Sequence, residues 1–293
     1  MKKTIRIFFT VLFIWSGVNL PLYSVELTTL FHGGSLSFDR ESESVETSLS
    51  GTDFLYGLSL FGEQSIDDNL TLQAGFVYDP VLRYTTYTTF QYSRDFYTIG
   101  VGPFFGLFNS WETIMKSGIS TSVRLDFPGI AFASFRSDSS IAARFTKAGD
   151  YLQEHNEISV GYYIPYAICS FNLTTKRYVA QQTDTLEVDD SFTEYAYKVD
   201  IFQKNVPVRV TLSFAFQQLD RIYSSGGSSE TNSLNSLILG TNFRVELFPD
   251  VILITMMDSN IYSFGSAAGN ALSLPEGIGY FLFRGAIGAQ ISF

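Results

Sequence analysis

Strict alternation of apolar and polar residues recurs along this chain and restricts how it can fold. It is clearest from Val206 to Gln218. One parity there holds Val206, Val208, Val210, Leu212, Phe214 and Phe216, and the other holds Arg209, Thr211, Ser213, Ala215 and Gln217. Successive side chains of a strand point to opposite faces, so a period of two residues predicts a strand with one face suited to hydrocarbon and one to water.

The same pattern returns in many other segments. Examples are Leu70–Tyr78, Ile119–Asp126, Glu194–Ile201 and Leu237–Leu247. Beyond residue 24, no run approaches the roughly 18 consecutive apolar residues of a membrane helix. Charged residues make up only 16% of the chain, while 28 Phe and 17 Tyr are many. A surface this poor in charge indicates a membrane, and without helices only a closed barrel satisfies its backbone groups there.

The first residues have the order of a secretory signal peptide. Lys2, Lys3 and Arg6 precede the apolar run Ile7–Trp15, which is too short to span a membrane as a helix. We expect cleavage after Ser24. The predicted domains are therefore a signal peptide, residues 1–24, and a transmembrane β-barrel, residues 25–293.

Short breaks between the strand segments alternate with longer polar ones. The short breaks are Ser65–Asn69, Ser93–Asp95, Pro128-Gly129, Pro165, Lys204-Asn205 and Pro249-Asp250. The longer ones are Arg40–Ser50, Asn109–Gly118, Thr146–Glu154, Gln182–Asp190, Ser224–Thr231 and Ser263–Gly277. Only the break near Asp79-Pro80 is short where a long one is due. Short periplasmic turns and longer outer loops are typical of outer-membrane barrels. The segments predict an all-β, closed, antiparallel up-and-down barrel of about 14 strands, with 12 or 16 as alternatives.

The C-terminal segment carries a recognisable signature. Phe283, Ile287, Ala289, Ile291 and Phe293 share one face, and the chain ends on Phe293. This resembles the last strand of bacterial outer-membrane proteins. The resemblance implies that Phe293 and Ile291 are an assembly signal read by the barrel-assembly machinery, and that the protein is integral to the outer membrane.

Within that class, the chain resembles monomeric porins and, more weakly, the long-chain fatty-acid transporter family. Members of the transporter family carry an N-terminal plug. Alternation here begins at Val25, which leaves little chain for one.

If the apolar faces meet lipid, the opposite faces line a lumen. The predicted pore-lining residues are Arg124, Asp126, Lys176, Glu194, Lys198, Asp200, Arg209, Arg244, Glu246, Asp258 and Arg284. A mixed set of charges indicates a wet and weakly selective pore, although internal ion pairs that plug the barrel are the alternative. By the same alternation some apolar residues also face the lumen. They predict either a path for a hydrophobic substrate or apolar packing under a loop that folds into the lumen. They are Ile252, Ile254, Met256, Phe96, Phe104 and Phe108.

No feature of the sequence indicates an enzyme, a cofactor or a metal. The two histidines are His32 in the first strand and His155, which we expect in a loop or rim beside carboxylates. The single cysteine, Cys169, cannot form an internal disulfide, and the net charge of −10 disfavours nucleic acid.

The leading expectation is therefore a porin-like channel for passive diffusion of small hydrophilic solutes. Its expected partners are outer-membrane lipid, the assembly machinery and those solutes, as a monomer or a homo-oligomer. A transporter of hydrophobic molecules such as fatty acids, and a barrel that displays adhesive loops, are the alternatives.

Overall fold

A computed structural model describes residues 24–35, 54–79, 82–108, 114–140, 152–181, 186–203, 206–225, 227–266 and 283–293. None of these residues forms a helix long and apolar enough to cross a membrane. They form fourteen strands: β1 (Ser24–Ser35), β2 (Phe54–Ser65), β3 (Leu70–Asp79), β4 (Arg83–Arg94), β5 (Tyr97–Phe108), β6 (Ile114–Phe127), β7 (Ala131–Ser140), β8 (Leu152–Ile164), β9 (Ala167–Gln181), β10 (Leu186–Phe202), β11 (Val208–Ser225), β12 (Ser228–Phe248), β13 (Val251–Ser266) and β14 (Phe283–Ser292).

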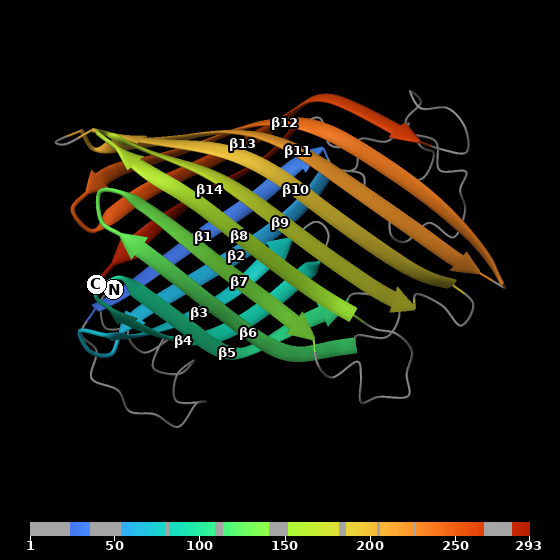
Figure 1. Cartoon of the computed structure of the whole chain (residues 1–293), viewed down its shortest axis with the longest axis horizontal. Coiled ribbons are helices and arrows are strands. Elements are labelled where there is room, and N and C mark those ends of the chain that lie inside the picture. The colour runs from blue at the N-terminus through green and yellow to red at the C-terminus, as the bar shows by residue number, and fades with distance from the viewer. Residues whose placement is uncertain are drawn as a thin grey trace.

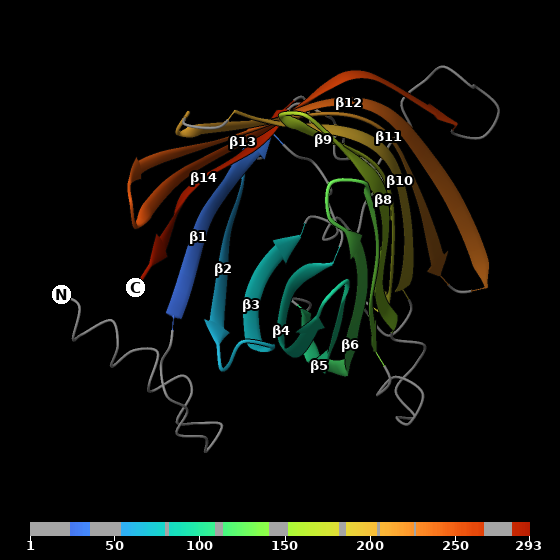
Figure 2. The ribbon, with the colours of Figure 1, turned by 60° about the vertical axis from the view of Figure 1, so that its left-hand side comes forward.

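The strands close into one barrel (Figures 1 and 2). Each strand pairs antiparallel with the strand that follows it in sequence, and β1 pairs with β14 from Glu26 opposite Ser292 to Gly34 opposite Arg284. The predicted closed up-and-down barrel of about fourteen strands is thus confirmed. Of the predicted signal peptide, only Ser24 lies within the described residues, and β1 begins there.

Local chemistry forms the short turns at one end of the barrel. Between β2 and β3, Asp67 Oδ1 accepts hydrogen bonds from the backbone N–H groups of Asn69 and Leu70, both at 2.8 Å. Between β6 and β7, the Ile130 N–H donates to the Phe127 carbonyl at 2.9 Å, and Gly129 has φ +75°. Proline followed by a glycine at positive φ is the composition of a type II turn. The predicted breaks at these positions are therefore turns.

Connections at the other end are shorter than the sequence predicts in three places. The stretch Asn109–Gly118 was predicted as a long break, but β5 runs to Phe108 and β6 starts at Ile114. The stretch Gln182–Asp190 was predicted as a loop, but β9 runs to Gln181 and β10 starts at Leu186. Likewise, only residues 226 and 227 separate β11 from β12 within the predicted loop Ser224–Thr231. Polar residues in these stretches pair across strands, so their polarity does not mark a loop. The expectation that only the break near Asp79-Pro80 is short was wrong.

The extended hairpins make one side of the barrel wall taller than the rest. Strands β10 to β13 have 16 to 21 residues, whereas β3 to β7 have 10 to 14. A tilted strand needs about 9–11 residues to cross the hydrocarbon. The long strands therefore continue beyond the membrane, and Figure 1 shows β11 and β12 reaching past the green strands.

Candidate functional site

Contacts between strands that are not neighbours identify the inner face of the wall. Lys176 on β9 pairs with Asp79 on β3. The Gln153 Nε2 on β8 donates to the Thr85 Oγ1 on β4 at 2.9 Å. Because the barrel is closed, side chains of such distant strands can meet only through the lumen. The residues that alternate with these positions therefore face outward.

The outward-facing side chains are strongly apolar across the middle of the barrel. The exposed ones include Ile99, Val101, Ile119, Val123, Leu125, Phe135, Ile158, Val160, Tyr195, Tyr197, Leu212, Phe214, Leu239 and Phe243. Above this band the outer face becomes polar. Ser137 Oγ donates to Asn156 Oδ1 at 2.6 Å, and the Asn156 amide reaches Thr175 Oγ1 at 3.5 Å. This row of polar side chains lies toward the end of the barrel with the longer connections.

Aromatic side chains surround the opposite end of the band, close to the short turns. They are Phe96, Phe127, Tyr166, Phe248 and Phe293, all exposed. Phe96 stacks on Phe127 with ring centroids 5.9 Å apart. An apolar band bordered by an aromatic girdle, on a closed barrel with an even number of strands, is the outer surface of an outer-membrane barrel. The chain is an integral outer-membrane β-barrel.

Comparison with known proteins adds little to this assignment. No protein-family model and no curated protein matches the sequence. Solved structures that align with it include OmpT of Vibrio cholerae, at 11% identity and a TM-score of 0.41 over 92% of this chain and 97% of the other. A bacterial polysaccharide outer-membrane secretin aligns at 12% identity and 0.43 over 92% and 98%. An anion-selective porin from Comamonas acidovorans aligns at 12% and 0.38 over 93% and 99%. The assignment rests on the strand pairing and surface of this chain.

Most of the predicted lumen charges lie on the inner face of the barrel in ion pairs. Arg124 Nη2 lies 2.8 Å from Asp126 Oδ2, and Arg284 Nε lies 2.8 Å from Asp258 Oδ2. Arg209 pairs with Asp200, and Lys176 pairs with Asp79. Charges of both signs are thus held close together on the inner face. Whether these side chains line a conducting path stays a prediction.

The remaining predicted residues have polar partners or lie near strand ends. Glu194 accepts a hydrogen bond from the Gln217 amide, and Arg244 Nη2 donates to Gln290 Oε1 at 3.0 Å. Lys198 and Glu246 share the inward parity, and neither forms an ion pair with another described residue.

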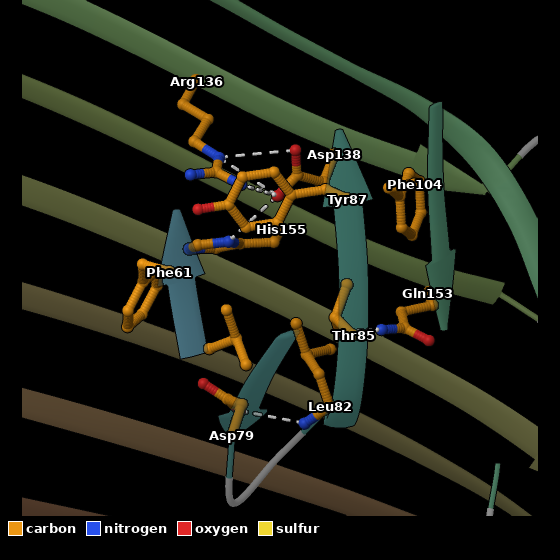
Figure 3. Close-up of a pocket in the computed structure, with 11 residues that line it drawn as sticks. Phe61, Asp79, Leu82, Thr85, Tyr87, Phe104, Arg136, Asp138, Gln153 and His155 are labelled. Carbon is orange, nitrogen blue, oxygen red and sulfur yellow. Dashed lines mark hydrogen bonds and ion pairs between the residues drawn. The ribbon is translucent and has the colours of Figure 1, made fainter. Parts of the chain in front are cut away.

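A cluster that the sequence analysis missed fills one side of the lumen (Figure 3). Asp138, only 6% exposed, lies 3.1 Å from Arg136 Nη2 and 3.6 Å from His155 Nδ1. The Arg136 guanidinium also lies 4.5 Å from the ring centre of Tyr87, across the barrel on β4. His155 was predicted in a loop or rim, but it lies within β8 opposite Asp138. The alternation from Ala131 to Ser140 could have placed Arg136 and Asp138 on the inner face, because the two residues lie on the same side of that strand.

A cavity of about 130 Å³ lies among these side chains, Asp79, Phe61 and Phe104. Its polar groups already bond to one another, because Asp138 is paired with Arg136, Gln153 with Thr85 and Asp79 with Lys176. Among the described residues, no three His, Cys, Asp or Glu side chains gather as metal ligands would. The cavity is therefore a small gap in a packed cluster.

The predicted inward apolar residues have different positions. Ile254, 3% exposed, packs with Leu30 and Ala286, and Ile252 packs against this group, while Met256 is 38% exposed. Phe104 is buried in the cluster beside Tyr87.

The prediction for Phe96 was wrong. Phe96 lies in the turn before β5 and stacks on the outward-facing Phe127, so it belongs to the girdle. The parity of a strand does not extend into the turn beside it. The side chain of Phe108 lies outside the described part of the chain.

Proposed function

We propose that this barrel is a passive channel for small hydrophilic solutes. One observation carries the proposal: ion pairs on the inner face of β10 to β14 keep charged side chains of both signs partly exposed to solvent. Arg209 is 42% exposed and Asp200 17%, while Arg284 and Asp258 are 30% and 31% exposed. Charges held in this way favour a water-filled lumen with weak ion preference.

The inner apolar residues give less support to a transporter of hydrophobic molecules. A path for hydrophobic molecules needs a continuous strip of exposed apolar side chains, but Ile254 is buried against Leu30 and Ala286. These residues pack against one another on the inner face of β13, β14 and β1, which is a structural role. Lipid retained through purification by a folded, non-conducting barrel would favour the transporter instead.

The tall wall supports display of an extracellular surface as a second candidate function. Strand β12 alone has 21 residues, and its first part holds Ser228, Ser229, Thr231 and Asn232. Polar strands raised above the membrane are suited to contacts with other cells or molecules. A channel and a display surface can coexist in one barrel, so the two functions need separate assays.

We give His155 a structural role and propose no catalytic activity. Its neighbour Asp138 is already paired with Arg136 at 3.1 Å. A general base needs a partner whose orientation serves the reacting group, whereas this carboxylate holds the wall of β7 against β8.

Single-channel conductance of the refolded mature chain in a planar bilayer tests the channel directly. We expect stable current steps, and Arg209→Gln should shift the preference toward cations because Asp200 loses its countercharge. The matched control is Arg177→Gln, since Arg177 forms a similar pair with Asp189 on the outer face. A folded barrel that never conducts would contradict the channel.

A further inference from the structure

The ion pair between Asp79 and Lys176 ties two opposite parts of the barrel wall together. Asp79 is the last residue of β3, and its Oδ1 also accepts a hydrogen bond from the Leu82 N–H at 2.9 Å. Lys176 lies within β9, with its Nζ 5.2 Å from the ring centre of Phe192. Both side chains are mostly buried, 18% and 15% exposed. Each partner is thus held in place by a second contact.

Further contacts on the same side of the lumen reinforce this tie. Gln153 on β8 bonds to Thr85 on β4, and Arg136 on β7 stacks over Tyr87 on β4. Strands β3 and β4 are therefore joined to β7, β8 and β9 through the interior. In Figure 2, β3 to β6 curl together under β8, while β10 to β13 spread away from them.

These contacts divide the lumen into two unequal lobes. The filled lobe, between β3 and β9, holds the packed cluster and its small cavity toward the end with the longer connections, while the pair Arg124–Asp126, 42% and 33% exposed, lies at its short-turn end. The open lobe, bounded by β9 to β14, β1 and β2, holds the exposed pairs Arg209–Asp200 and Arg284–Asp258. The Asp79–Lys176 pair lies on the boundary, because β3, which holds Asp79, is the neighbour of β2, and β9, which holds Lys176, is the neighbour of β10.

We infer that the Asp79–Lys176 pair forms the constriction of the channel and sets its ion preference. The inference rests on the proposed channel function. In this arrangement an ion pair that joins opposite parts of the barrel wall narrows the channel, and ions pass only through the open lobe. With both charges present, the pair acts as a dipole at the edge of the path and favours neither anions nor cations strongly.

Reversal potentials under a salt gradient test this role. Lys176→Met removes the positive charge beside Asp79 and should shift the channel toward cations, while Asp79→Asn should shift it toward anions. A unit charge about 4 Å from the ion path in water favours one ion and disfavours the other equally, so the cation-to-anion permeability ratio changes by about 30-fold. Conductance should rise in both variants, because the tie across the lumen is broken. Arg177→Met, at the next position of β9 on the outer face, should change neither quantity.

A cross-linking measurement tests the geometry without requiring any current. In a Cys169→Ala background, Asp79→Cys with Lys176→Cys should be joined within one chain by a short bis-maleimide, as read by mass spectrometry of the folded protein in lipid. Asp79→Cys with Arg177→Cys is the control and should not be joined, because the wall separates the two thiols.

The outcomes separate this inference from the channel function. A conducting wild type whose preference is unchanged in both single variants overturns the constriction and leaves the channel intact. Failure to cross-link Asp79→Cys with Lys176→Cys also overturns it. A wild type that never conducts overturns the channel, and with it the role of the pair, even where the cross-link forms.

Discussion

At the scale of single residues, the most deeply buried charges in the described part of the chain are Arg221 and Asp190. Arg221 Nε lies 2.6 Å from Asp190 Oδ1, a second bond joins Nη2 to Oδ2 at 3.0 Å, and each side chain is 1% exposed. They face each other directly on β10 and β11. A two-bond pair of this kind aligns the two strands, whereas a single charge there would be costly.

Removing one partner should therefore destabilise the barrel. We expect Arg221→Met to lower the free energy of unfolding by about 3–5 kcal/mol, because it removes the guanidinium that pairs with the buried Asp190. Urea-induced unfolding in lipid vesicles, followed by tryptophan fluorescence, measures the change. The exposed pair Arg177–Asp189 gives the control, and Arg177→Met should cost less than about 1 kcal/mol. Equal losses in the two variants would show that burial does not set the effect.

At the scale of elements, the seam between β1 and β14 decides whether the sheet becomes a barrel. Leu30 on β1 lies opposite Gly288 on β14, and a Cβ at Gly288 would collide with the backbone carbonyl of Thr29. The two strands can approach there only because the residue has no side chain. The Phe293 N–H then donates to the Val25 carbonyl at 3.0 Å and extends the seam to the last residue.

A side chain at this glycine should weaken closure. We expect Gly288→Val to destabilise the barrel by about 1–3 kcal/mol, the range for overpacked sites. Heat-modifiable migration on a gel should show a lower temperature for loss of the folded band. Ala289→Val, at the next position on the outer face, should migrate like the wild type. An unchanged Gly288→Val barrel would mean that the seam can spread without cost.

At the scale of the whole molecule, the barrel is uneven both in height and in filling. Strands β10 to β13 rise above the membrane and bound the open lobe, while the shorter β3 to β7 belong to the filled one. The uniform apolar band nevertheless runs around both halves, because lipid imposes the same requirement on every strand.

That requirement predicts opposite outcomes for neighbouring substitutions on β11. Leu212 is 42% exposed on the outer face, so Leu212→Arg should cost about 2–4 kcal/mol and reduce the yield of folding into lipid vesicles. Ser213→Arg, one position along and facing the lumen, should fold almost as well as the wild type. The reverse order would mean that the two faces of β11 are assigned wrongly.

The sequence alone was enough to predict the closed barrel and its turns. Alternation with a period of two determines which side of a strand each residue faces, and lipid permits no open edge. Local signals were sufficient for turns as well, since Asp67 and the Pro128-Gly129 pair act on their own neighbours. Such features depend on residues close in sequence or on the solvent.

Only the tertiary structure decided which inner residues meet across the lumen. Asp79 and Lys176 are 97 positions apart, and Thr85 and Gln153 are 68 apart. Alternation gives the face of a residue but not its height or the strand opposite, which follow from the stagger and closure of all the strands together. For the same reason, Asp190 looked like part of a polar loop until Arg221 on the neighbouring strand proved to be its partner.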